Sequence, residues 1–80
     1  MYTVGYTSKS KKQLESLGKI LRFEFVLFFK QLVVNPFIGK LSDTTYHAHI
    51  KHKWVAVWNV DKKFKTVTIT YIGSRESAPY

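Results

Sequence analysis

The hydrophobic and polar positions alternate at the start of the chain and then change to a helical spacing. Tyr2, Val4 and Tyr6 alternate with small or polar residues, which is the period of a half-buried strand. Ser8 is a candidate N-cap for a short helix over 9–17, which ends at a glycine. The pattern therefore predicts one strand followed directly by a helix.

A long apolar segment predicts a second helix over 19–34. The Asn35-Pro36 pair should end it, because proline disfavours a helical conformation in the residue before it. The segment is too short, and too often interrupted by charged residues, to cross a bilayer, which needs about 20 apolar residues. One helical face carries large apolar side chains, namely Leu21, Phe25, Phe28 and Leu32.

This second helix carries more apolar residues than one buried face requires. A helix that is apolar nearly all round is either deeply buried or contacts another molecule. Core packing accounts for most of the excess. We expect Phe23 and Phe29 to remain exposed for a protein partner.

Three strand-like runs follow, over 45–50, 54–60 and 64–72, with a turn at 61–63. Their short connections predict antiparallel hairpins. The order is an N-terminal strand, a two-helix hairpin and an antiparallel three-stranded meander, an α+β fold with the helices packed on the sheet. Neither an internal repeat nor a linker is visible, so we expect a single domain over 1–80.

Composition narrows the class of protein. The chain is 45% hydrophobic and 16% aromatic, which favours a folded globule over a disordered tail. Thirteen Lys and Arg against five Asp and Glu give a formal charge of +8, which favours anionic partners such as nucleic acid. There is no cysteine. This absence fits a reducing compartment, and with no secretory signal pattern we expect a cytoplasmic protein without membrane contact.

The segment from Tyr46 to Lys53 is the richest in chemistry. On a strand, alternate side chains share a face, so His47, His49 and Lys51 should lie together. Imidazoles with a pKa of about 6.5 exchange protons at neutral pH, and lysine binds phosphate. In RNA cleavage a base removes the 2′-hydroxyl proton, cations stabilise the phosphorane and an acid protonates the leaving oxygen.

Two other interpretations of this row remain open. It can be the solvated face of a strand, because exposed basic rows are common. A zinc site on His47, His49 and His52 is the other, although no cysteine or nearby carboxylate completes the ligand set. We expect no metal and no other cofactor.

The remaining candidate site residues are an arginine and a tyrosine near the end of the chain and one of two tryptophans. Arg75 follows the last strand and can bind a phosphate with its guanidinium, or simply pair with Glu76. Tyr80 is the terminal residue. Trp54 stands at a strand start and can stack on a base, whereas we expect Trp58 to lie in the core.

Several of these segments together resemble the C-terminal half of RelE/ParE-superfamily toxins. They are Tyr46–Ile50, Trp54–Trp58, Val67–Ile69, Ile72–Glu76 and the terminal Tyr80. The order of elements predicted above also resembles that family, so the likeness covers the whole chain. It implies a toxin of a type II toxin–antitoxin system that is held inactive by a cognate antitoxin protein.

The resemblance to RelE-type members also implies roles for residues. Such toxins cleave messenger RNA on the ribosome without a metal, which would make this chain an endoribonuclease and translation inhibitor. His47 or His49 would act as base or acid, and Arg75 would hold the scissile phosphate. Tyr80 would stack on a base or assist proton transfer. The residues expected to position the RNA are Lys51, Lys53 and Trp54.

One departure keeps other functions open. Nucleolytic members often carry an arginine where this chain has Val55, and loss of a guanidinium weakens stabilisation of the transition state. ParE-type relatives share the fold but bind DNA gyrase and cut no RNA. An inactive, basic RNA-binding relative is a third function.

Overall fold

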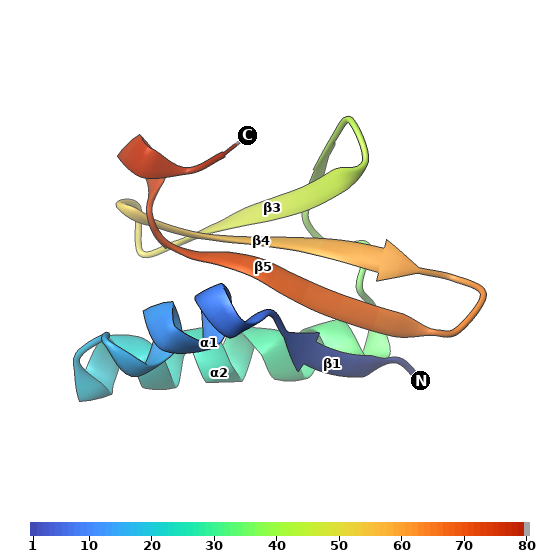
Figure 1. The fold of residues 1–80 in the computed structure, drawn as a ribbon, viewed down its shortest axis with the longest axis horizontal. Helices are drawn as coiled ribbons and strands as arrows, with labels where there is room; N and C mark the ends of the chain where they lie inside the picture. Colours follow the sequence, from blue (N-terminus) through green and yellow to red (C-terminus); the bar gives the residue numbers. More distant parts are fainter. Residues whose placement is uncertain (80) are drawn as a thin grey trace.

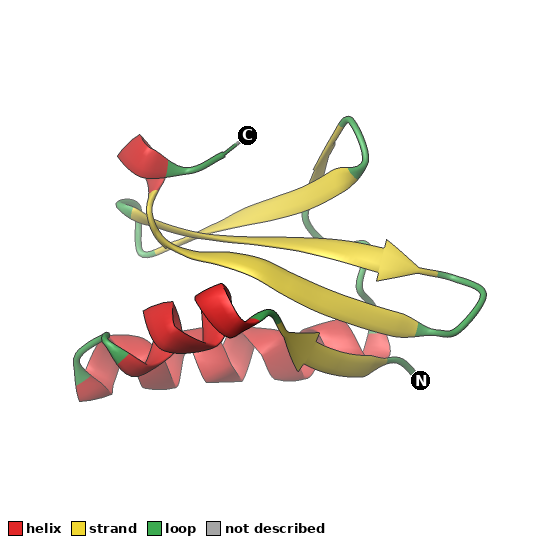
Figure 2. Cartoon of the chain, in the orientation of Figure 1, coloured by secondary structure: helices red, strands yellow, loops and turns green. Residues whose placement is uncertain are grey.

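The computed structural model describes residues 1–79 as one five-stranded mixed sheet with two helices on one face (Figure 1). The elements are β1 (Thr3–Tyr6), α1 (Ser8–Glu15), α2 (Lys19–Val34), β2 (Lys40–Ser42), β3 (Thr45–Ile50), β4 (Trp54–Asp61), β5 (Thr66–Ser74) and a 3₁₀ turn, η1 (Arg75–Ser77). Figure 2 shows helices and sheet as two layers, with η1 and the chain end on the far side of the sheet. The predicted α+β fold is confirmed.

The strand order is β1-β5-β4-β3-β2. Strands β3, β4 and β5 form the predicted antiparallel meander. Two strands extend it. β1 pairs with β5 in parallel, and both helices and the other three strands lie between them in the sequence. β2 pairs antiparallel with β3 and was not predicted.

The observed ends of the helices can be compared with the predicted ones. α2 has the predicted bounds, and its last turn stops at the Asn35-Pro36 pair. The predicted cap of α1 is wrong, because Thr7 rather than Ser8 accepts a hydrogen bond from the Ser10 backbone N–H. The third strand of the meander starts later than predicted. The Asp61 carboxylate accepts from the Lys63 and Phe64 backbone N–H groups and folds them into the turn.

The core lies between α2 and the sheet. Its fully buried side chains include Phe25 and Leu32 from α2 and Trp58 and Ile69 from the sheet. The predicted core position of Trp58 is confirmed, and its indole N–H donates to the Pro36 carbonyl at 2.9 Å. No helix of residues 1–79 is long and apolar enough to cross a membrane.

The first helix is fastened to β5 by polar side chains. β5 carries one extra residue, Thr70, between the pairs that its neighbours make with β4. Beyond the end of β1, the Ser10 hydroxyl donates to the Ile69 carbonyl at 2.6 Å, and the Gln13 amide oxygen accepts from the Ile72 N–H at 3.0 Å. These two side chains satisfy buried strand groups that no neighbouring strand reaches.

Candidate functional site

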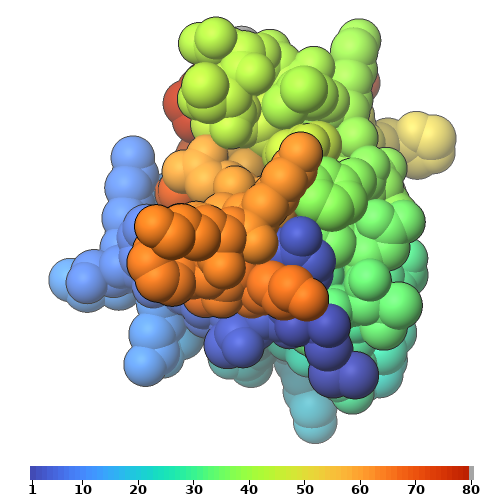
Figure 3. Space-filling model, turned by 90° about the vertical axis from the view of Figure 1, so that its right-hand side faces the viewer, coloured from blue at the N-terminus to red at the C-terminus, as the bar shows by residue number. Residues whose placement is uncertain are grey.

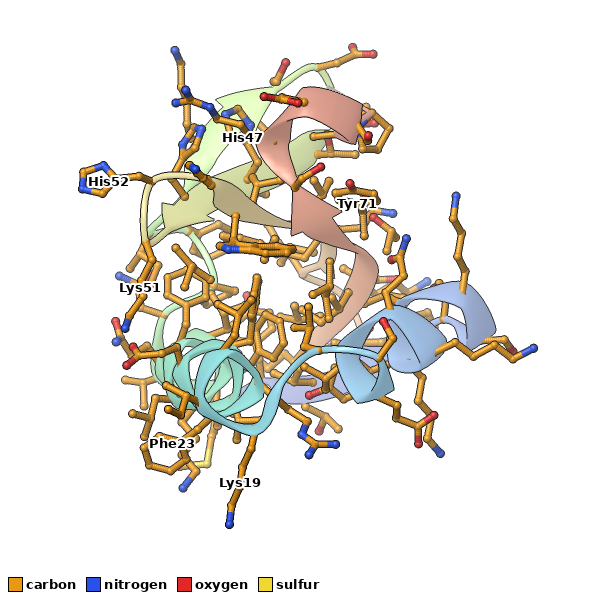
Figure 4. All side chains as sticks on the ribbon, turned by 90° about the vertical axis from the view of Figure 1, so that its left-hand side faces the viewer. Lys19, Phe23, His47, Lys51, His52 and Tyr71 are labelled. Carbon is orange, nitrogen blue, oxygen red and sulfur yellow. The ribbon has the colours of Figure 1, made fainter. Side chains whose placement is uncertain are left out.

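The face of the sheet without helices carries both histidines of β3. Strand alternation turns Tyr46, Ala48 and Ile50 toward the helices and His47 and His49 away from them, as predicted. Figure 4 shows His47 on the side opposite the helices. We call this side the open face.

His47 lies in the middle of this face. It pairs across the strands with Lys40 of β2 and Val57 of β4, and its ring centroid lies 6.1 Å from that of His49. Only 7% of its surface is exposed, so the alternative of a solvated strand face does not describe His47. Burial, followed by the charges of His49 and Lys40, lowers the pKa of His47. The imidazole is therefore held in its neutral form, which accepts a proton.

His49 is exposed and stands at the edge of an apolar strip. It pairs with Val55 of β4, which pairs in turn with Gly73 of β5. Val55 is fully buried, because it packs with Val57 and Tyr71 under the half-buried Ala78 of the chain end. Val55 therefore forms an apolar floor beside His49.

Arg75 follows the end of β5 and lies beside the turn between β3 and β4. Its backbone N–H donates to the Lys53 carbonyl at 2.8 Å, which ties η1 to that turn. A shallow hollow opens between these segments, lined by Lys53, Trp54, Ser74, Arg75 and Glu76. The fold thus brings together three predicted residues, Arg75, Lys53 and Trp54. Tyr80 lies outside the described residues.

Lys51 does not share the face of the histidines, contrary to the prediction. β3 ends at Ile50, and Lys51 and His52 adopt positive φ angles of 53° and 62° in the turn. The Lys51 ammonium lies 3.6 Å from the Glu24 carboxylate of α2, on the helix-covered side. Figure 4 shows Lys51 on that side and His52 pointing outward from the turn. The role of Lys51 in RNA binding stays a prediction.

The zinc interpretation finds no support in this geometry. His52 points away from His47 in Figure 4. Within residues 1–79 no three histidine, cysteine or acidic side chains are grouped closely enough to hold a metal ion.

Lys40 is the residue of this face that sequence reasoning missed. It is exposed on β2 and directly opposite His47, so its side chain leaves the sheet on the same side. β2 has three residues and pairs only with β3, and three residues are too few for alternation to predict a strand. No local signal could have identified it, since the strand exists through its pairing.

The outer surface of α2 is the second candidate site. Phe23 is 60% exposed, as predicted, but Phe29 is buried at 3% and the prediction for it is wrong. Phe29 lies one turn after the core residue Phe25 and contacts Tyr6 of β1. Figure 4 shows Phe23 and Lys19 projecting away from the sheet. A hollow there is lined by Lys19, Ile20, Arg22, Phe23 and Val26.

Comparison with known proteins gives a fold but no sequence family. No protein-family model matches the chain. No curated protein matches its sequence either.

Solved structures match over nearly the whole chain. The isolated RelE toxin of E. coli superimposes with a TM-score of 0.85 at 18% identity, over 99% of this chain and 89% of that chain. A chain of the RelE–RelB complex from Pyrococcus horikoshii gives 0.78 at 22% identity, over 96% and 98%. A chain of the toxin–antitoxin complex RelBE2 from Mycobacterium tuberculosis gives 0.78 at 22%, over 92% and 98%. The RelE-like fold predicted from the sequence is confirmed.

Proposed function

We propose that this chain is the toxin of a toxin–antitoxin pair and cuts messenger RNA on the ribosome without a metal. The observation that carries the proposal is the pair of imidazoles on the open face, with ring centroids 6.1 Å apart. Similarity to the RelE fold supports the toxin class. The site of action would be the cytoplasm, where translation takes place.

The two histidines divide the acid and base roles by their surroundings. Neutral His47 takes the proton of the 2′-hydroxyl as the 2′-oxygen bonds to phosphorus. His49, exposed beside it, gives a proton to the 5′-oxygen as the P–O5′ bond breaks. The products are a 2′,3′-cyclic phosphate and a 5′-hydroxyl, and the protons balance.

The cations at the end of the sheet would bind the RNA. Arg75 would hold the non-bridging oxygens of the scissile phosphate, and its exposed guanidinium can bind them in bidentate fashion. Lys53 would position the backbone from the adjacent turn, and Trp54 would stack on a base at the rim of the same hollow. Lys51 and the terminal Tyr80 complete the proposed set.

The proposed protein partner is an antitoxin. RelE chains of known structure occur in complexes with RelB antitoxins. The outer surface of α2 offers exposed apolar side chains between cationic ones, which suits an amphipathic partner with acidic flanks. The net charge of +8 favours the same partner chemistry.

The test is translation of a defined messenger in a purified system, with new 5′ ends mapped by primer extension. We expect cuts inside codons that require translating ribosomes. His47→Ala, His49→Ala and Arg75→Ala should each reduce cleavage by about 10²-fold or more, the usual contribution of proton transfer or of a transition-state contact. His52→Ala is the matched control, because His52 points outward from the neighbouring turn, and it should cleave like the parent.

A second function is favoured by one observation. Val55 forms an apolar floor where nucleolytic relatives often carry a guanidinium, and a protein that only binds its target needs no such group. If the messenger stays intact, inhibition of DNA gyrase becomes the leading proposal. A supercoiling assay with purified gyrase would then separate that function from an inactive RNA-binding protein.

A further inference from the structure

The turn between β4 and β5 exposes three lysines around one aromatic ring. Residues 61–65, which we call the lysine turn, are all exposed, and Phe64 is 70% exposed. Figure 3 shows this turn, in orange, projecting toward the viewer beside the N-terminus in blue. The Phe64 ring lies outside both groups of buried apolar side chains, so it is available to another molecule.

The lysine turn contains one acidic residue, and its carboxylate fixes the backbone. Asp61 accepts hydrogen bonds from the backbone N–H groups of Lys63 at 3.0 Å and of Phe64 at 3.1 Å. The Thr3 N–H donates to the Lys65 carbonyl at 2.9 Å, which ties the end of the turn to β1. The acidic side chain is thus engaged by the turn itself, and the three lysines determine the sign of the charge at its surface.

Two ammonium groups of the lysine turn lie against aromatic rings. The Lys63 Nζ is 5.6 Å from the centroid of the Phe64 ring, and the Lys62 Nζ is 5.4 Å from that of Phe37. An ammonium group within about 6 Å of a ring centroid is attracted to the face of the ring. Phe37 in turn contacts Tyr46 of β3, with ring centroids 5.8 Å apart. The cations therefore lie beside rings, one of them exposed, on a surface that is attached to the core.

We propose that the lysine turn is a second RNA-binding site, where an unpaired base stacks on Phe64 and the neighbouring phosphates contact the three lysines. Every base has a flat face, so stacking on an aromatic ring tolerates any sequence. An ammonium group binds a phosphate as a point charge and needs no fixed orientation. The inference rests on the proposed function for its natural ligand, but binding of RNA by this turn needs no cleavage.

The lysine turn lies at the opposite end of the sheet from the hollow around Arg75. β4 begins at Trp54, opposite Ser74, and ends at Asp61, opposite Thr66. At about 3.3 Å a residue, the length of β4 separates the two ends by about 20–25 Å. Figure 1 shows the turn and η1 at opposite ends of the sheet. A nucleotide held in the hollow cannot also reach the turn, so the turn adds a separate contact, and two linked contacts raise the overall affinity.

The combination of one ring with several cations favours RNA over other anionic partners. A membrane anchor inserts a row of apolar side chains into the bilayer, and the lysine turn has only one. An acidic protein surface would pair with the lysines but offers the ring no flat partner. A nucleotide joins a flat base to a charged phosphate, and single-stranded RNA repeats this unit along its length.

The experiment measures binding of the full chain to a fluorescent oligouridine of about eight nucleotides, with 2′-O-methyl groups that prevent cleavage. Phe64→Ala should weaken binding about fivefold or more, the usual effect of removing a ring on which a base stacks. Phe64→Leu should weaken binding as much, because it keeps apolar surface but removes the ring. Phe64→Trp should bind at least as tightly as the parent.

The lysines are tested through the salt dependence of the same binding. For single-stranded nucleic acid, the logarithm of the binding constant falls with the logarithm of the salt concentration, with a slope of about 0.7 for each phosphate contact. Lys63→Gln should therefore reduce this slope by about 0.7. The matched control is Lys9→Gln, which changes an exposed lysine of α1 and should keep the slope of the parent.

The outcomes separate this inference from the proposed function. If Phe64→Ala binds the oligonucleotide like the parent, the inference is overturned even where the parent cuts the messenger. If, in addition, vesicles containing phosphatidylserine bind the parent but not Phe64→Ala, the turn is a membrane anchor instead. If Phe64→Ala binds the oligonucleotide weakly but the parent cuts no messenger, the RNA site stands and the nuclease proposal fails.

Binding to purified ribosomes identifies the natural source of the RNA. A loss of affinity in Phe64→Ala on ribosomes without a messenger would assign the turn to ribosomal RNA. A loss on ribosomes that carry a messenger, and on no others, would assign it to the messenger. Both results support the RNA site, whereas equal affinities of the parent and Phe64→Ala for both kinds of ribosome would overturn it.

Discussion

The two faces of the sheet differ in what fills them. The covered face is a continuous layer of large side chains, with Trp58 stacked on Tyr46 and in contact with Phe28 of α2. The open face is divided. Its apolar centre around Val55 and Val57 is small, polar residues occupy the β4–β5 end, and the histidines line β3. Most of the fold's stability therefore comes from one face, which leaves the other able to carry groups that titrate.

This division explains how a short chain can hold a buried imidazole. Burying a polar group costs stability, and 80 residues supply only a modest core. Here the covered face includes a buried tryptophan, three α2 aromatics of which Phe25 and Phe29 are buried, and the β5 aliphatics. The buried imidazole of His47 thus lies outside the layer of side chains that forms the main core.

The largest expected effect lies on the covered side. Phe25→Ala should lower the free energy of unfolding by about 3–5 kcal/mol, because it empties a fully buried position. Phe23→Ala, the same change two residues away on the exposed side of α2, should cost less than about 1 kcal/mol. Urea unfolding of both variants makes the measurement. Equal losses would mean that α2 does not bury the face described here.

If Phe25→Ala fails to fold, Phe25→Leu serves as the second measurement. It keeps most of the apolar volume and should cost about 1–2 kcal/mol. A loss no larger than that of Phe23→Leu would contradict the assignment of the two faces.

The next effect concerns the centre of the open face. Val55→Arg should cost about 1–3 kcal/mol, because a guanidinium does not fit under Ala78 and must displace it. Asn59→Arg, on the same strand, the same face and exposed, is the matched control and should change stability by less than about 0.5 kcal/mol. If the chain is a nuclease, Val55→Arg should also cleave faster despite its lower stability.

The sequence predicted those features of the two faces that depend on residues near one another in the chain. The bounds of α2 and β3 follow from apolar spacing and from the Asn35-Pro36 stop, and both are confirmed. β2 forms only through its pairing with β3, and no spacing of apolar residues predicts it. Alternation could not predict the burial of His47, because that burial depends on its neighbours on β2 and β4.

The bulge in β5 is a second feature that the sequence pattern did not predict. Alternation predicts that Ile69 and Tyr71 share a face. The extra residue Thr70 instead turns Ile69 and Ile72 to the helices and Tyr71 to the open face. The Thr70 hydroxyl donates to the Val57 carbonyl at 3.2 Å, a contact that depends on the register of both strands. The candidate site was therefore predictable by residue type on β3, but its apolar floor was not.

A smaller effect is the pH dependence that His47 adds to stability. Because its pKa is lowered in the folded state, the unfolded chain binds its proton more readily. Its contribution is fully present above the unfolded pKa of about 6.5 and is lost as the pH falls toward the folded value. Urea midpoints measured from pH 7.5 down to pH 5 should therefore fall less in His47→Gln than in the parent. His52→Gln should follow the parent, and a parallel loss in all three proteins would contradict the burial of His47.

The smallest expected effect tests which side of the sheet Lys51 serves. Its ammonium lies 3.6 Å from the Glu24 carboxylate, and both side chains are more than a third exposed, so Lys51→Ala should cost less than about 0.5 kcal/mol. Lys51 was expected to join the histidines in RNA binding, yet it projects on the helix side, while Lys53 borders the hollow beside Arg75. Lys53→Ala should therefore weaken binding of single-stranded RNA more than Lys51→Ala, and the salt dependence of binding should fall more. Equal losses would mean that the RNA passes around the end of the sheet and touches both faces. The open face would then be one wall of the binding surface rather than the whole of it.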